Sequence, residues 1–214
     1  FWPELFRGIA WSTGAVLAQT LAAARAHAGE CHLLEPLRDV DEAGDLVAWA
    51  DLPAVQAAGR GRVSVVIPAC NEASYLPRTL AAVRRGGPHE TIVVDGGSTD
   101  GTREIARAHD AIVLTAPAGR ATQMNCGAAI ATGEWLLFLH ADTLPPADYA
   151  RHVRETLARP GVVAGAVEFA IADDFPGRRW IERATNLRAR HWQSPYGDQA
   201  LFLRRETFRR AGGV

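Results

Sequence analysis

The sequence predicts an α/β fold, with a doubly wound, mostly parallel sheet flanked by helices. Two observations carry this prediction. Continuous runs of apolar, largely β-branched residues alternate with segments of helical period, as expected for parallel strands that are covered on both faces. Polar residues gather directly after these runs, where ligands bind in sheets of this kind.

The expected elements follow one another regularly from residue 63 onward. Strands are predicted at 63–67, 91–95, 111–115 and 135–139, and helices at 74–85, 100–108, 119–133 and 147–159. Pro68 is expected to end the first strand, because proline lacks the donor that a strand ladder needs. An apolar run at 162–171, a helix at about 178–190 and the segment ALFLRR follow less regularly, which predicts a mixed sheet there.

A partial α/β segment is expected before this domain. Residues 1–56 predict a helix at 13–27 and a strand at 31–34, followed by the acidic stretch LRDVDEAGDL. The polar, glycine-containing AAGRGR predicts a linker at 57–62, so the main domain is expected to span 63–214. The chain starts without methionine and stops at AGGV, which favours a piece of a longer polypeptide, truncated at its C-terminus.

The composition excludes several classes of protein. The 214 residues carry a formal net charge of −1, which gives no general electrostatic argument for a nucleic-acid partner. Three cysteines without CxxC spacing disfavour a disulfide framework or a zinc site and favour a reducing cytoplasm. No uncharged stretch is apolar and long enough to span a membrane, and no signal peptide is recognisable, so a cytoplasmic location is expected.

The first two strands end in polar turns. Asn71 and Glu72 follow the first strand, either as functional groups or as the cap and first-turn acid of the next helix. Asp95 ends the second strand before GGSTDGT, in which Ser98 or Thr99 could cap the following helix. This segment is neither a P-loop nor a GxGxxG fingerprint. Asp95 could accept a hydrogen bond from a nucleobase imide, or it could be an ordinary turn aspartate.

The third helix opens with AGRATQMN, beginning after Gly119. Backbone N–H groups at a helix start suit an anion, and Arg120 adds a side chain that can clamp a phosphate. Asn125 is expected about one and a half turns further on. The alternative for Arg120 is a solvated surface arginine.

The fourth strand ends in FLHADTLPP. The i, i+2 spacing of His140 and Asp142 places both side chains on one side of an extended segment. Mg²⁺ or Mn²⁺ is often held by one or two carboxylates while substrate phosphates complete the shell. Asp142 is therefore a candidate ligand, and His140 a possible direct or indirect one. The alternative is a pair of turn residues, but four polar strand ends on one rim favour function.

From about residue 63 to 214, the chain resembles the family 2 inverting glycosyltransferases of GT-A fold. VVIPACNEA, IVVDGGSTDGT and FLHADT are similar to that family's opening strand, its second strand with aspartate and its metal motif. GRATQMNCGAA and PYGDQALFLRRETFRRAGGV further resemble the subgroup called radical-SAM/selenodomain-associated transferase 2, or arsenosugar-biosynthesis glycosyltransferases. In residues 1–56, LFRGIAWSTGAVLAQTL and LRDVDEAGDL resemble the end of the companion transferase 1, a nucleotidyltransferase-like protein, which implies a fusion.

The resemblance implies roles for individual residues. The turn through Ala69, Asn71 and Glu72, with Asp95, would hold the nucleoside of a nucleoside diphosphate sugar. The resemblance further implies that Gly119, Arg120 and Asn125 border the nucleotide site and that Asp142 binds Mg²⁺ or Mn²⁺. It places Asp198 and Gln199 on the acceptor side.

Two departures from the family pattern stand out. His140 takes the place of the first acid of the metal motif, and the downstream Glu-Asp pair that usually holds the catalytic base is absent. Asp198 is the nearest remaining acid and the candidate base in this chain, although the main base is expected beyond Val214.

The predicted function is metal-dependent, inverting transfer of a sugar from a nucleoside diphosphate sugar to an unidentified acceptor hydroxyl. The alternatives are a nucleotide-binding piece without turnover and a nucleotidyltransferase of related fold. The segment RRWIERATNLRARHW could bind an anionic acceptor or lie on a membrane surface as a peripheral contact. A solvated helix face is the favoured interpretation of that segment.

Overall fold

The computed structural model describes residues 19, 22, 59–171, 176–192 and 200–214. The chain divides into two compact units, Phe1–Arg38 and Asp39–Val214, and nearly all described residues belong to the second. Apart from residues 19 and 22, the helix and strand expected before residue 57 lie outside the described residues. The proposed division at 57–62 stays a prediction.

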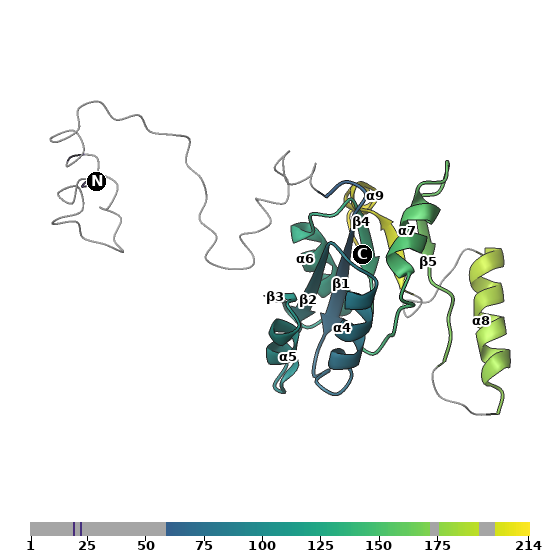
Figure 1. Cartoon of the computed structure of the whole chain (residues 1–214), viewed down its shortest axis with the longest axis horizontal. Helices are drawn as coiled ribbons and strands as arrows, with labels where there is room; N and C mark the ends of the chain where they lie inside the picture. Colours follow the sequence, from purple (N-terminus) through teal and green to yellow (C-terminus); the bar gives the residue numbers. More distant parts are fainter. Residues whose placement is uncertain (1–18, 20–21, 23–58, 172–175, 193–199) are drawn as a thin grey trace. The chain divides into compact units, whose positions relative to one another are not determined.

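Six strands form one mixed sheet in the order β3-β2-β1-β4-β6-β5. Its strands are β1 Val63–Ala69, β2 Glu90–Asp95, β3 Ile112–Thr115, β4 Trp135–Phe138, β5 Ala164–Ala166 and β6 Leu201–Arg204. The helices are α4 Leu76–Arg85, α5 Thr102–Ala108, α6 Arg120–Ile130, α7 Tyr149–Leu157, α8 Arg178–Trp192 and α9 Arg205–Ala211. The first four strands are parallel, and β6 runs antiparallel to β4 and β5 (Figure 1). The predicted α/β fold with a mixed later sheet is confirmed.

The central strands β1, β2 and β4 are largely buried on both faces, which explains why they are continuous apolar runs. Successive residues of β1 point to opposite faces: Val65 and Ile67 belong to one core cluster and Val66 to the other. Apolar residues of α4 and α7 complete the first cluster, and those of α6 and α9 complete the second. Within the described helices, none is long and apolar enough to cross a bilayer.

The expectation that Pro68 ends the first strand is wrong. β1 continues to Ala69, and Pro68 is paired in register with Val94 of β2. In a parallel strand, the backbone groups of alternate residues face alternate neighbours. Pro68 faces the β4 side, where the ladder has already ended at Val66 and Phe138, so its missing N–H breaks no hydrogen bond.

The apolar run at 162–171 forms only a three-residue strand, β5. Beyond it, side chains of α8 take the backbone groups that a neighbouring strand would otherwise bind. Asn186 accepts the N–H of Phe169 at 2.8 Å and donates to its carbonyl at 2.9 Å. Glu182 accepts the N–H of Ile171 at 2.9 Å. The segment therefore stays hydrogen-bonded without continuing the sheet.

Candidate functional site

The sheet has a topological switch point between β1 and β4. From β1 the chain proceeds outward through β2 and β3, then returns to place β4 on the other side of β1. The loops after β1 and β4 diverge at this point, and ligands of open α/β sheets bind there, beyond the carboxyl ends of the strands. Three of the four predicted polar turns follow β1, β2 and β4 at this edge.

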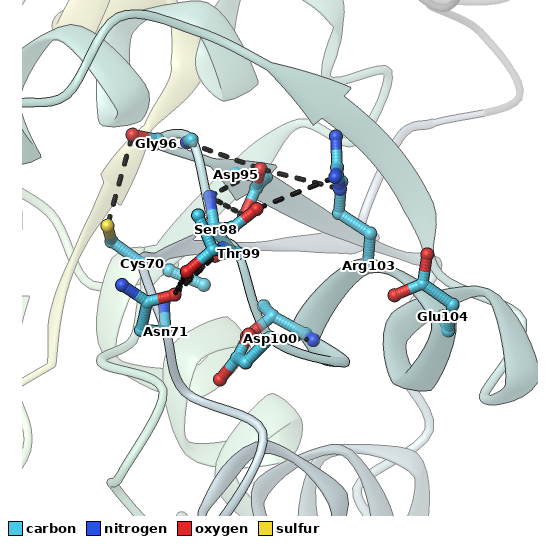
Figure 2. A network of polar contacts seen from close by, with 12 residues as sticks. Cys70, Asn71, Asp95, Gly96, Ser98, Thr99, Asp100, Arg103 and Glu104 are labelled. Carbon is cyan, nitrogen blue, oxygen red and sulfur yellow. Dashed lines mark hydrogen bonds and ion pairs between the residues drawn. The ribbon is translucent and has the colours of Figure 1, made fainter.

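The loops after β1 and β2 are joined by side chain to backbone hydrogen bonds (Figure 2). Asn71 has a positive φ of 58°, and its backbone N–H donates to Ser98 Oγ at 2.8 Å. Its side-chain oxygen accepts the N–H of Thr99 at 2.9 Å. The N–H of Glu72 donates to Thr102 Oγ1 at 2.8 Å. These contacts fix the two turns as one unit.

The expected helix caps in these loops are therefore wrong. Helix α4 begins two residues later than expected, after Tyr75, and α5 begins after Gly101. Neither of these two residues makes a side-chain capping hydrogen bond. Asn71, Ser98 and Thr99 are occupied across the loops instead, with partners 27 and 28 residues away in sequence.

Asp95 is fully buried beneath this unit. Its carboxylate accepts the backbone N–H groups of Gly97 at 3.2 Å and Ser98 at 3.1 Å. Arg103 Nε lies 3.8 Å from the same carboxylate oxygen, Oδ2 (Figure 2). These contacts are those expected of an ordinary turn aspartate. Recognition of a nucleobase by Asp95 stays a prediction.

Gln123 is a site residue that the sequence reasoning missed. Its buried side-chain amide donates to the carbonyl of Ala69 at 2.8 Å and to that of Val94 at 2.7 Å. One side chain from α6 therefore ties the carboxyl ends of β1 and β2 together. No local signal marks this residue, because a glutamine in a helical segment is ordinary and its partners are decided by packing.

The predicted residues of α6 separate into two groups. Gly119, with φ 142°, precedes Arg120, the first residue of the helix, and no side chain caps this end. Arg120 is exposed and makes no hydrogen bond or ion pair within the described residues. Asn125 instead binds the backbone of Val214, donating to its carbonyl at 2.8 Å and accepting its N–H at 3.0 Å. The structure thus engages Asn125 with the C-terminal segment.

The loop after β4 is a turn rather than the extended segment that was expected for His140 and Asp142. The N–H of Thr143 donates to the carbonyl of His140 at 3.1 Å. The buried Thr79 of α4 donates its hydroxyl to the carbonyl of Ala141 at 2.6 Å, which anchors the turn. Asp142 is exposed and accepts the Thr143 hydroxyl at 3.3 Å, whereas His140 is half-buried.

Three carboxylates of these loops, Glu72, Asp100 and Asp142, form what we call the acidic rim. Burial raises the pKa of Glu72 above its ordinary value, and the negative charges of Asp142 and Asp100 raise it further. A hydrogen bond from the Thr102 hydroxyl holds the pKa of Asp100 below its usual value. The carboxylate of Glu72, after β1, therefore interacts with that of Asp142, after β4, across the switch point.

Two predicted residues, Asp198 and Gln199, lie outside the described residues. Among the residues that are described, no group of three or more His, Cys, Asp or Glu side chains could hold a metal ion by itself. A cation at the acidic rim would need ligands from a bound substrate.

Comparison with known proteins decides the family. The model for the family described as Glycosyl transferase family 2 matches residues 64–211. This chain belongs to glycosyl transferase family 2. The matched range includes the residues of the acidic rim together with Asp95 and Arg120. The prediction of a family 2 glycosyltransferase is therefore confirmed at the level of the family.

Curated relatives of this family 2 chain include a PGL/p-HBAD biosynthesis glycosyltransferase of Mycobacterium bovis BCG. It is 34% identical over 151 residues, which cover 66% of this chain and 54% of the relative. Glycosyltransferase AglE of Haloferax volcanii is 33% identical over 138 residues, covering 58% of this chain and 45% of the relative. The chain thus spans about half the length of the curated relatives it matches.

Solved structures confirm the GT-A fold of this family 2 chain. Glucosyl-3-phosphoglycerate synthase from Mycobacterium tuberculosis in complex with UDP superposes with a TM-score of 0.52 at 22% identity, over 80% of this chain and 64% of the other. The same enzyme with Mn²⁺, UDP and glucosyl-3-phosphoglycerate gives a TM-score of 0.53 at 23% identity, over 80% and 63%.

Proposed function

We propose that this protein transfers a sugar from a nucleoside diphosphate sugar to an acceptor hydroxyl, with a divalent cation and with inversion at the anomeric carbon. The observation that carries the proposal is the acidic rim at the switch point of a glycosyl transferase family 2 domain. Carboxylates from the loops after β1, β2 and β4 share one field there, beside the turn that buries Asp95.

The donor is proposed to bind across the joined loops. The turn from Ala69 to Glu72 and the buried Asp95 would hold the nucleoside. Arg120 and the uncapped start of α6 supply cationic and N–H donors for the diphosphate. The solved complexes of glucosyl-3-phosphoglycerate synthase with UDP and UDP-glucose support a donor of this class.

The residues present fit a divalent cation shared with the substrate. The exposed Asp142 offers carboxylate oxygen, the ligand type that Mg²⁺ and Mn²⁺ prefer. Burial raises the pKa of Glu72, the negative charges of Asp142 and Asp100 raise it further, and a cation at the rim would relieve that repulsion. We propose Asp142 as the protein ligand, with His140 direct or through water. When bound, Mg²⁺ or Mn²⁺ would neutralise charge that develops on the leaving diphosphate.

The chain's own residues would perform the remaining steps. Arg120 and the α6 N–H groups would orient the diphosphate and stabilise its departure. The acceptor hydroxyl, deprotonated by a carboxylate, would attack the anomeric carbon from the face opposite the nucleotide. Asp198 is the proposed base among the acids of this chain, with Gln199 on the acceptor side. The carbonyl of Ala200, which follows them, accepts the N–H of Val167 at 3.4 Å.

The decisive experiment is nucleotide binding followed by thermal unfolding. UDP, GDP and their sugar conjugates are added with and without Mn²⁺ to the protein and to Asp142→Ala. A ligand at about 100 times its dissociation constant stabilises the folded state by about 2.7 kcal/mol. We expect a Mn²⁺-dependent shift that the substitution removes. A cooperatively unfolding protein that shifts with none of these nucleotides would refute the proposal.

Turnover and stereochemistry need separate assays. The anomeric configuration of the product, followed by NMR with the accepted donor, tests inversion. Release of pyrophosphate instead of a nucleoside diphosphate would indicate the alternative, a nucleotidyltransferase. Turnover that appears only when the chain is extended beyond Val214 would indicate that the catalytic base lies outside residues 1–214.

The finer assignment is also a proposal. We propose that the chain belongs to the arsenosugar-biosynthesis subgroup, because GRATQMNCGAA and the C-terminal segment resemble it. Residues 1–56 are proposed to be the end of a fused, nucleotidyltransferase-like domain. The proposed location is the cytoplasm. Acceptor screening with hydroxylated arsenicals against ordinary sugars and lipids tests the subgroup. Turnover confined to acceptors without arsenic would contradict it.

A further inference from the structure

Helix α8 turns one polar side toward residues 169–171 and exposes apolar side chains elsewhere. Its half-buried residues are Arg178, Glu182, Thr185 and Asn186, which recur with helical spacing on one side. Through Glu182 and Asn186 this side holds the backbone of residues 169 and 171. The sequence alone favoured a solvated polar face: Arg179 and Arg183 are indeed exposed, whereas Glu182 and Asn186 make internal contacts.

The opposite side of α8 combines a large aromatic residue with arginines. Trp180 is 75% exposed, Leu187 is 55% exposed and Ile181 is 39% exposed. Trp180 and Leu187 are seven residues apart, so they lie on the same helix face. Arg179 and Arg183 are exposed along this side and form no ion pair within the described residues. We call Arg179, Trp180, Ile181, Arg183 and Leu187 the α8 outer face.

The charge of α8 contrasts with that of the whole chain. The helix contains five arginines and a single glutamate, whereas the chain has a formal net charge of −1. The one glutamate, Glu182, is on the inward side, 3.7 Å from Arg178. An exposed apolar strip beside uncompensated arginines is typical of helices that lie in the headgroup region of a bilayer.

We propose that the α8 outer face docks on an anionic lipid surface. Trp180 would lie at the boundary between headgroups and acyl chains, with Leu187 beside it and Ile181 at the flank, while Arg179 and Arg183 contact lipid phosphates. This chemistry disfavours two other occupants. A second copy of the same face would bring arginines against arginines, and RNA would leave the aliphatic Ile181 and Leu187 without stacking partners. The proposal does not depend on the glycosyl transfer.

The test is co-sedimentation of the full chain with vesicles of phosphatidylglycerol or of phosphatidylcholine at low and high salt. We expect binding to the anionic vesicles only, weakening as salt screens the arginines. Trp180→Ser is expected to weaken binding roughly tenfold, because the apolar anchor is lost. Arg179→Glu with Arg183→Glu should reduce it by a similar or larger factor.

Matched controls separate the outer face from general charge and apolarity. Val163→Ser removes another exposed apolar side chain, 62% exposed, and Arg84→Glu with Arg85→Glu makes the same charge change on α4. Both controls should bind anionic vesicles as the parent does. Equal loss in the controls, or no binding to anionic vesicles at low salt, would overturn the proposal.

Two further measurements would reveal a different binding partner of the α8 outer face. If another part of the protein or a second copy covered the face, Trp180→Ser would lower the melting temperature or change the oligomeric state. Either result overturns the proposal. Binding of a single-stranded RNA that Arg179→Glu with Arg183→Glu abolishes, without binding to anionic vesicles, overturns it in favour of nucleic acid.

Discussion

Two carboxylates at opposite edges of the sheet, Glu90 and Asp142, are in opposite situations. At the amino edge, Glu90 Oε1 accepts the Ser64 hydroxyl, the Thr132 N–H at 2.6 Å and the Thr132 hydroxyl at 2.9 Å. At the carboxyl edge, Asp142 accepts only the Thr143 hydroxyl within the described residues, and its charge adds to the effect of burial in raising the pKa of Glu72. A carboxylate whose acceptor sites are filled by the protein is structural, whereas one that repels its neighbours is available to a cation.

The largest expected effect is the loss of turnover when Asp142 is substituted. We expect Asp142→Asn to lower turnover by roughly 100-fold or more, because the carboxylate that would bind the cation at the leaving diphosphate is lost. Stability should change by less than about 0.5 kcal/mol, since the side chain is exposed. Steady-state kinetics and thermal unfolding measure the two effects.

Asp110→Asn is the matched control for this substitution. Asp110 is an exposed acid with a positive φ of 59°, which asparagine tolerates well. Its replacement should change neither turnover nor stability appreciably. If Asp142→Asn unfolded the protein while keeping its activity per folded molecule, the contrast between the two edges would be wrong.

The amino edge should show the opposite pattern. Glu90→Ala leaves the Ser64 hydroxyl and the Thr132 N–H without their acceptor, so we expect a loss of about 2–3 kcal/mol of unfolding free energy. Activity per folded molecule should be unchanged. Urea unfolding measures the loss, and Glu104→Ala, which removes an exposed acid paired with Arg107 at 3.8 Å, should cost little.

Gln123 tests whether the carboxyl edge depends on a structural residue. Gln123→Met keeps the size of the side chain but removes the donors to Ala69 and Val94, so we expect a loss of about 1–2 kcal/mol. The loops after β1 and β2 would loosen, which should raise KM for the donor more than it lowers kcat. A fall in kcat at constant KM would contradict this role.

The smallest effect is a pH dependence at Glu72. Its pKa in the folded state lies above the ordinary value of 4.5, so the folded protein binds more protons than the unfolded chain between the two values. Stability therefore decreases as the pH rises through this window. At pH values above this window, Glu72→Gln should increase the unfolding free energy slightly, by less than about 1 kcal/mol. Below the window it should change nothing.

Thermal unfolding between pH 4 and pH 8 checks this dependence. Asp142→Asn should shift the same window downward, because it removes one of the charges that raise the pKa of Glu72. An unchanged pH profile in Asp142→Asn would mean that the carboxylates of Glu72 and Asp142 do not interact electrostatically.

Most elements of the domain were readable from local pattern. Strands such as β2 and β4 are continuous apolar runs because both faces of the sheet are covered, and this signal survives in the sequence. The run at 162–171 carries the same signal, yet only residues 164–166 pair as a strand. Side chains of α8 take its remaining backbone groups, and apolar pattern holds no information about such partners.

The sequence by itself determined the α/β class, the family and the acids at the strand ends, because these depend on short periods and short motifs. Tertiary structure decided which of those residues are engaged: Asn71 binds the next loop, Gln123 joins two strands, and Asn125 binds the C-terminal segment. It also decided that Asn186 and Glu182 of α8 bind the backbone of residues 169 and 171. Hydrogen-bond partners many residues apart are chosen by the packing that brings their loops together, and no local pattern encodes that choice.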